Sequence, residues 1–129
     1  MNDPRRSTGT AFTRAWPVLY VDDEPGNLLP FTLQFRDEFE IMTAANGHEA
    51  MEVLAAAPVA VLLTDHRMPE ITGVDLCEQV RDRWPHVLRI LVTAYSDQQV
   101  AIDAINRGGV LRYITKPWNV ESERQILSE

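Results

Sequence analysis

The sequence predicts an α/β fold: a doubly wound, five-stranded parallel sheet in the order 2-1-3-4-5, flanked by five helices. The first observation behind this prediction is a set of short apolar runs, which are typical of strands buried on both faces of a parallel sheet. The second is that segments with helical spacing alternate with these runs, as crossovers between parallel strands require. With 129 residues, 45% of them hydrophobic, the chain has the size and core of one domain.

Two strand–helix pairs are expected in the first half of the chain. The apolar run from Trp16 to Val21 predicts the first strand, and the segment from Glu24 to about Arg36 predicts the first helix. Strand character returns from Phe39 to Ala44. Asn46-Gly47 is a turn signal that ends this strand, and the next helix is expected from Glu49 to Ala56.

Three further strands and three further helices complete the pattern. Strands are expected from Val59 to Thr64, from Val87 to Val92 and from Val110 to Thr115, because each is a short, mostly apolar run. Helices are expected from Gly73 to Arg83, from Asp97 to Asn106, and from about Asn119 onward. No internal repeat interrupts the alternation.

Acidic residues follow two strands that the predicted order makes neighbours. Asp22 and Asp23 follow the first strand and Asp65 follows the third, so three carboxylates are expected at the carboxyl edge of the sheet. Two carboxylates about 5 Å apart repel by roughly 3 kcal/mol at an effective dielectric of 20, so three together require a cation or protonation. Oxygen ligands without His or Cys, in an incomplete protein shell, favour Mg²⁺.

Thr93 and Lys116 follow the fourth and fifth strands at the same edge. A hydroxyl and an ammonium can hold the oxygens of an anion that also contacts the metal. Phosphoryl transfer requires such an arrangement, because its catalysis is largely positioning and neutralisation of charge. Asp65 can act as the nucleophile, as in enzymes that form an aspartyl phosphate.

Four motifs stand at four strand ends: Val21-Asp22-Asp23-Glu24-Pro25, Thr64-Asp65-His66-Arg67-Met68-Pro69 with Gly73, Val92-Thr93-Ala94, and Tyr113-Ile114-Thr115-Lys116-Pro117. Together they resemble a two-component response-regulator receiver domain, which has a flavodoxin-like fold. The likeness runs from about Pro17 to the C-terminus. It implies a receiver domain over 16–129, preceded by a flexible tail over 1–15.

The resemblance implies a role for each acid. Asp65 is the expected phospho-acceptor. Asp23, the Asp65 carboxylate and the backbone carbonyl of Arg67 are the expected Mg²⁺ ligands, and Asp22 is expected to reach the metal through water.

The resemblance also implies a switch. Lys116 is expected to pair with the phosphoryl oxygens, and its bond to Pro117 is a candidate cis peptide. Thr93 is expected to hydrogen-bond the phosphoryl group once it arrives. Tyr113 matches the aromatic switch position of the family, where the ring turns inward as the hydroxyl residue moves.

The implied function is a phosphorylation-dependent switch. A histidine kinase supplies the phosphoryl group, and the modified surface signals to an output domain or partner protein. The domain is not an enzyme for any external substrate, since it catalyses only its own phosphorylation and dephosphorylation. The segment Arg112 to Trp118, with its Lys-Pro-Trp ending, resembles a receiver subgroup often fused to sensor kinases or cyclic-di-GMP phosphodiesterases.

Composition argues against several other functions. The net charge is −7, and the 12 Lys and Arg residues are dispersed among 19 acids, which argues against direct nucleic-acid binding. The sequence has neither a signal peptide nor an apolar run long enough to span a membrane. Cys77 is the single cysteine, so a reducing cytoplasm is the expected location.

Two rival functions follow from the same residues. A Mg²⁺-dependent phosphohydrolase with an aspartyl nucleophile usually has a second acid two residues later, but Arg67 stands there, and the length has no room for a cap domain. A receiver-like interaction module that is never phosphorylated is the other rival, although the intact acidic cluster speaks against it.

Several other residues have ordinary interpretations. His48, His66 and His86 lie on different segments without ligand spacing and are expected to be exposed or locally hydrogen-bonded. Cys77 is expected in the core, on one helix face with Val74 and Val80. Trp118 is either a packing anchor or part of a partner-facing surface.

Overall fold

A computed structural model describes residues 16–115 of the chain, apart from the side chain of Tyr95. The strands are β1 (Pro17–Val21), β2 (Glu40–Ala44), β3 (Val61–Asp65), β4 (Leu88–Thr93) and β5 (Arg112–Thr115). The helices are α3 (Pro25–Phe35), α4 (Gly47–Ala56), α5 (Gly73–Arg83) and α6 (Gln98–Asn106), with a short 3₁₀ turn, η1 (Tyr95–Asp97), before α6. The predicted tail over 1–15 and the helix predicted from Asn119 lie outside the described residues.

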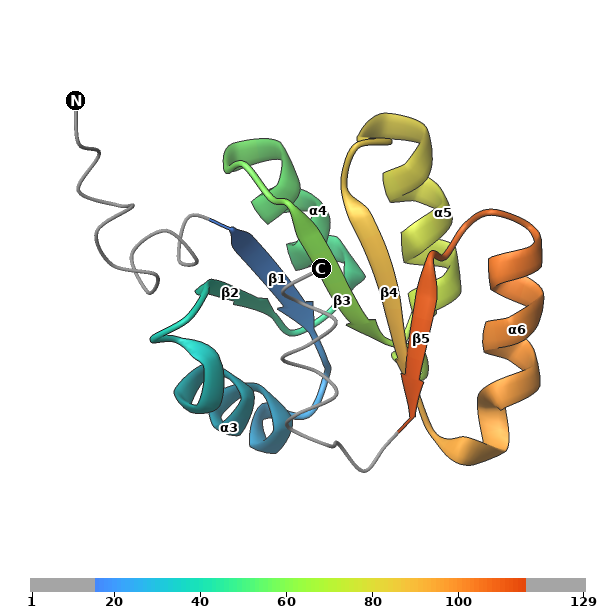
Figure 1. Ribbon diagram of the computed structural model, residues 1–129, viewed down its shortest axis with the longest axis horizontal. Coiled ribbons are helices and arrows are strands. Elements are labelled where there is room, and N and C mark those ends of the chain that lie inside the picture. The colour runs from blue at the N-terminus through green and yellow to red at the C-terminus, as the bar shows by residue number, and fades with distance from the viewer. Residues whose placement is uncertain (1–15, 116–129) are drawn as a thin grey trace.

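The five strands form one parallel sheet in the order β2-β1-β3-β4-β5, as predicted (Figure 1). β1 lies between β2 and β3, so the chain moves outward in one direction to β2 and in the other through β3, β4 and β5. The switch between these directions lies at β1 and β3, and their carboxyl ends are therefore adjacent. β2 and β5 are the outer strands.

Helices cover both faces of the sheet, and the alternation of side chains along each strand explains why. Leu19 and Val21 of β1 and Leu62 of β3 point into a core shared with α4, α5 and α6. Val18 and Tyr20 point the other way, into a second core that includes three phenylalanines of α3 and the turn after it: Phe31, Phe35 and Phe39. Because they are buried on both faces, β1 and the first three residues of β3 form continuous apolar runs.

Two predicted boundaries were wrong in a way that matters for the site. Asp65 and Thr93 were expected to follow their strands, but each is the last residue of its strand, β3 or β4. The backbone of Asp65 is registered with Val92 of the neighbouring strand, and Thr93 with Thr115. The backbones of both residues are therefore held by the hydrogen-bond ladder of the sheet and not by a loop.

The start of α4 also differs from the prediction, whereas α5 begins at Gly73 as predicted, and capping explains the difference in α4. α4 begins at Gly47, two residues before the expected Glu49, because the Asn46 side chain accepts a hydrogen bond from the Glu49 backbone N–H at 2.8 Å. The Glu49 side chain in turn accepts from the Ala45 N–H at 3.0 Å. Thr72 caps α5 in the same way, through the N–H of Asp75.

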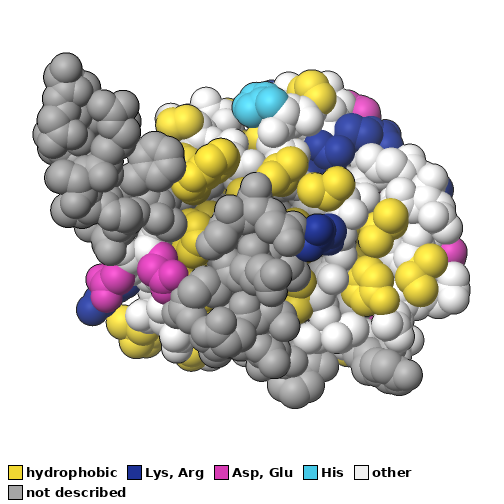
Figure 2. Space-filling model, in the orientation of Figure 1, with side chains coloured by type: hydrophobic (Ala, Val, Ile, Leu, Met, Phe, Trp, Pro, Cys, Tyr) yellow, Lys and Arg dark blue, Asp and Glu magenta, His cyan; other side chains and the backbone are white. Residues whose placement is uncertain are grey.

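The surface combines apolar and charged side chains. On the face in Figure 2, hydrophobic side chains are scattered, and those of Lys and Arg lie in separate patches among them. Among residues 16–115, the large exposed hydrophobic side chains include Trp16, Leu29, Leu33, Leu88, Val100, Ile102 and Leu111. Within residues 16–115 no helix has the length and apolar character that crossing a membrane requires.

Candidate functional site

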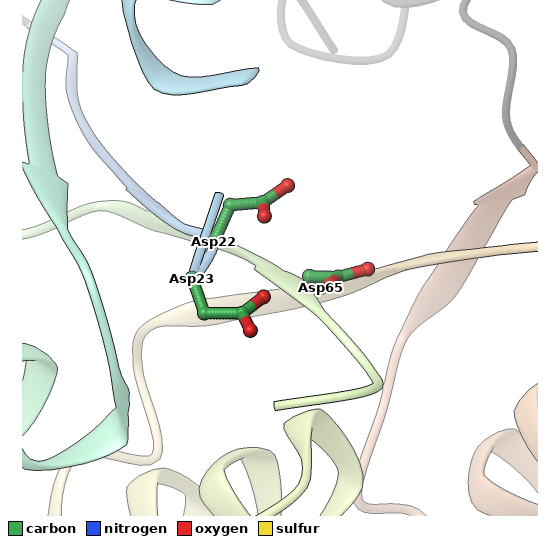
Figure 3. Close-up of side chains that lie close together, drawn as sticks. All are labelled: Asp22, Asp23 and Asp65. Carbon is green, nitrogen blue, oxygen red and sulfur yellow. The ribbon is translucent and has the colours of Figure 1, made fainter. Parts of the chain in front are cut away.

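Three carboxylates meet at the carboxyl edge of β1 and β3, as the sequence predicted. One oxygen each from Asp22, Asp23 and Asp65 lies within 4.8 Å of the others. Figure 3 shows all three carboxyl groups pointing to the same side of the strand ends. Asp22 and Asp65 are buried, whereas Asp23 is exposed. The site therefore opens to solvent at Asp23.

Asp22 is held in place by three donors. The Tyr20 hydroxyl donates to its carboxylate at 2.8 Å, the Asn27 side-chain amide at 3.0 Å and the Glu24 backbone N–H at 3.0 Å. Its own N–H donates to the Ala44 carbonyl of β2 at 3.1 Å. A carboxylate with no exposed surface needs such partners, since an unpaired buried charge is costly. Asp22 thus has a fixed orientation toward the other two acids.

The backbone around Asp65 is braced by the start of α5. The Gly73 N–H donates to the His66 carbonyl at 2.8 Å. A Cβ at Gly73 would collide with the Asp65 carbonyl oxygen and come within 2.8 Å of the Leu91 side chain. Gly73 of the predicted motif is therefore required for close approach of the helix to the strand end.

Thr93 is fully buried at the end of β4, two strands away from β1. Its hydroxyl donates to the Ala94 carbonyl at 3.2 Å. Ala94, the next residue, is exposed.

Arg67 makes a contact that the sequence did not indicate. Its guanidinium donates two hydrogen bonds to the Asp97 carboxylate, from Nε to Oδ2 at 2.6 Å and from Nη2 to Oδ1 at 2.7 Å. This pairing holds the pKa of Asp97 below its ordinary value and raises that of Arg67. The loop after β3 is thereby joined to η1, the turn after β4.

Tyr113 is half-buried on β5, and its hydroxyl is engaged. The side-chain amide of Gln98, the first residue of α6, donates to the Tyr113 hydroxyl at 2.7 Å. The ring is therefore tethered to α6 in this conformation.

The remaining predicted residues have three different outcomes. Lys116, Pro117 and Trp118 lie outside the described residues. His48 and His86 are exposed as expected, and Cys77 is fully buried between Val74 and Val80 on the inner face of α5. His66 differs from its prediction, because its Nδ1 atom is buried and has no hydrogen-bond partner within residues 16–115.

The donor set fits a hard divalent cation. Three carboxylate oxygens lie close enough to share one ion, and neither His nor Cys belongs to the group. A solvent-facing Asp23 leaves room for the waters that Mg²⁺ retains. The acids Asp23 and Asp65 are the candidates for direct contact, and Asp22, already bound by three donors, is the candidate for contact through water.

Sequence reasoning missed the residues that hold the acids. Tyr20 lies two residues before Asp22, which directly follows β1, so continuing the period-two alternation of the strand could have indicated the contact. Asn27 lies in the first turn of α3, within hydrogen-bonding distance of Asp22. No sequence signal pairs Arg67 with Asp97, because 30 residues separate them.

Comparison with known proteins agrees with the family that the sequence motifs resemble. Residues 18–128 match the family described as response regulator receiver domain. The hydrogenase transcriptional regulatory protein HoxA of Cupriavidus necator is 40% identical over 101 residues, covering 78% of this chain and 21% of that protein. The chain therefore spans about a fifth of the length of this relative.

Solved structures with a similar fold include two that cover most of this chain. A protein of Neptuniibacter caesariensis has a TM-score of 0.85 and 32% identity, covering 89% of this chain and 86% of the other. The response regulator protein TrrA of Thermotoga maritima, solved in complex with Mg²⁺ and BeF, has a TM-score of 0.78 and 26% identity, covering 88% and 96%.

Proposed function

The chain belongs to the response-regulator receiver family, and from this premise we propose that Asp65 takes the phosphoryl group while Asp23, Asp65 and the Arg67 carbonyl bind Mg²⁺. The domain is a phospho-accepting receiver and not a conventional enzyme. The observation that carries the assignment is the convergence of Asp22, Asp23 and Asp65 within 4.8 Å at the end of β1 and β3.

The proposed reaction is a direct displacement at phosphorus. A carboxylate oxygen of Asp65 forms a bond to the phosphorus of a phosphohistidine on the partner kinase, and the bond from phosphorus to the imidazole nitrogen breaks. The electron pair of that bond leaves with the nitrogen. Bound Mg²⁺ would supply neutralisation of the phosphoryl oxygens, which is most of what such a transfer requires.

The protein's own residues hold the reacting carboxylate. The ladder of β3 fixes the backbone of Asp65, and Gly73 lets α5 brace the strand end from behind. Asp22, fixed by Tyr20 and Asn27, would orient a metal-bound water. Lys116 is proposed to pair with the phosphoryl oxygens on the family resemblance alone.

The switch is proposed to run through Thr93 and Tyr113. A phosphoryl group on Asp65 would offer the Thr93 hydroxyl a stronger acceptor than the Ala94 carbonyl it now contacts. Turning of Tyr113 would break its bond to Gln98 at the start of α6. Phosphorylation would thus favour one of two arrangements of β4, β5 and α6.

The phosphodonor is proposed to be a histidine kinase, in a cytoplasmic setting. The likeness to HoxA, a transcriptional regulatory protein, favours an output in transcription. The Lys116-Pro117-Trp118 motif instead favours fusion to a sensor kinase or a cyclic-di-GMP phosphodiesterase. The full reading frame around this chain would decide between these outputs.

The assignment of Asp65 is tested by labelling. The wild-type chain, incubated with acetyl phosphate and Mg²⁺, is expected to gain one phosphoryl group by intact-mass spectrometry, and Asp65→Asn is expected to gain none. Asp37→Asn, an exposed acid remote from the site, is the matched control and should label normally. Unchanged labelling of Asp65→Asn would refute the assignment.

The same preparation separates the rival functions. Steady turnover of a phosphomonoester by the wild-type chain would favour a phosphohydrolase. A receiver-like module that is never phosphorylated would show no labelling of the wild-type chain under any Mg²⁺ concentration.

A further inference from the structure

We propose that the paired side chains of Arg67 and Asp97 position the metal-binding loop, so that Asp97 is a positioning residue for Mg²⁺ binding although it is no ligand. The inference rests on the proposed function, in which the Arg67 carbonyl is a Mg²⁺ ligand. It adds a residue from a different element, 30 positions away in sequence, to the requirements of the metal site.

The geometry of the pair is specific. Both nitrogens of one edge of the guanidinium meet both oxygens of one carboxylate, at 2.6 and 2.7 Å. Such two-point contacts fix orientation as well as distance. The side chain of Asp97 is 7% exposed and that of Arg67 is 75% exposed, so a surface residue of the loop is fastened to a buried anchor.

The side chain of Asp97 does not cap α6, although its position suggests that it would. It directly precedes α6, where an Asp side chain ordinarily accepts a hydrogen bond from the first turn of the helix. Asp97 makes no such capping bond, and both of its carboxylate oxygens bind Arg67 instead. The helix start is thus left without a side-chain cap while the loop after β3 is held.

The anchor is itself tied to the strand that carries Thr93. The Asp97 N–H donates to the Ala94 carbonyl at 2.9 Å, the residue whose carbonyl also accepts from the Thr93 hydroxyl. The pair therefore joins the loop after β3 to the backbone beside the proposed phosphoryl-binding hydroxyl. Both ends of the connection lie next to the proposed site.

A carbonyl ligand depends on such support because it cannot turn independently of its backbone. Holding the Arg67 side chain limits the conformations of the same residue whose carbonyl is to meet the metal. Residues that orient metal ligands typically change metal affinity by about 10- to 100-fold when they are mutated. Losing the pair should therefore weaken Mg²⁺ binding.

The test is calorimetric titration of MgCl₂ into the chain at constant ionic strength. Arg67→Ala with Asp97→Ala removes the pair, keeps the backbone carbonyl and leaves the net charge unchanged. We expect the dissociation constant for Mg²⁺ to rise about 10-fold. Arg67→Lys, which keeps the charge but loses the two-point contact, should raise it by a smaller factor.

The matched control is Arg81→Ala with Asp82→Ala. These residues form an ion pair at 3.2 Å on α5, away from the acidic cluster, and their removal also leaves the net charge unchanged. The control should bind Mg²⁺ as the wild type does. Melting temperatures without Mg²⁺ check that each variant is folded, and Arg67→Lys keeps the test open if the double variant is not.

The outcomes separate this inference from the proposed function. Wild-type binding with dissociation constants of both Arg67 variants within twofold of it would overturn the positioning role and leave the metal site intact. Failure of the wild-type chain to bind Mg²⁺, or binding that survives Asp23→Asn with Asp65→Asn, would overturn the metal site and this inference together.

Discussion

At the scale of the residue, Gly73 shows how little space separates Asp65, the proposed phospho-acceptor, from the start of α5. Gly73→Ala would push a methyl group into the Asp65 carbonyl and the Leu91 side chain. We expect a loss of about 1 to 3 kcal/mol in the free energy of unfolding, measured in urea, because a packed region must shift. Phosphorylation by acetyl phosphate should slow as well, since the displaced group is the backbone of Asp65.

Gly26 is the matched control. It also lies in the first turn of a helix, and a Cβ there would meet nothing within 4 Å. Gly26→Ala should leave stability unchanged or raise it by up to about 1 kcal/mol, because alanine is the better helix former. Equal effects of the two substitutions would contradict the steric explanation.

Cys77 gives a prediction for alkaline pH. Burial raises the pKa of its thiol from 9.0 to about 12. In the unfolded chain the thiol ionises near its ordinary pKa, so its contribution to stability is complete below pH 9 and is lost as pH rises toward 12. We expect wild-type stability to fall more steeply than that of Cys77→Ala over this range.

The reactivity of the same thiol offers a direct measurement. At pH 8 a disulfide reagent such as dithionitrobenzoate should label Cys77 only in denaturant, because the folded thiol is protonated and fully buried. Rapid labelling of the folded chain would show that α5 opens readily or that the thiol is accessible.

At the scale of the element, helix α3 contains a residue that disfavours the helical conformation. Pro30 lies in the middle of the helix, where proline lacks the backbone donor and crowds the preceding turn. Pro30→Ala should therefore stabilise the chain, by about 1 to 3 kcal/mol in urea unfolding. Leu29→Ala changes the exposed neighbour and should have little effect. A destabilised Pro30→Ala would mean that proline itself is needed at this position.

The elements were predictable in kind and order but not at their ends. The apolar runs placed β1, β2 and β4 within one residue at both ends, because a short apolar run is bounded by polar or turn-forming residues on each side. The start of α4 was missed because the Asn46 side chain, read as a turn residue, also caps the helix. Asp65 and Thr93 were placed outside their strands because pairing with the neighbouring strand extends a strand beyond its apolar residues.

At the scale of the whole molecule, Mg²⁺ binding should raise the free energy of unfolding. A ligand that binds only the folded state adds about 2.7 kcal/mol at a concentration 100 times its dissociation constant. We therefore expect saturating MgCl₂ to raise the melting temperature by about 4 °C or more, relative to NaCl at equal ionic strength. Asp23→Asn should lose this increase and Asp37→Asn should keep it.

The predicted site could be derived from the sequence because parallel strands bring their carboxyl ends to one edge. That geometry alone predicts that Asp22, Asp23 and Asp65 lie close together, as they do. Side-chain partners could not be derived in the same way, because the choice between capping α6 and pairing with Arg67 depends on how two loops pack. Topology thus locates the acids, and packing decides what supports them.

The two outer strands have a consequence for how the protein behaves in concentrated solution. Unpaired strand edges invite other chains to add to the sheet, and short edges with charged residues discourage this. β2 and β5 have five and four residues, and exposed Glu40 and Arg112 begin them. Short edges that begin with charged side chains disfavour the addition of another chain to the sheet, so we expect the domain to stay dispersed at high concentration.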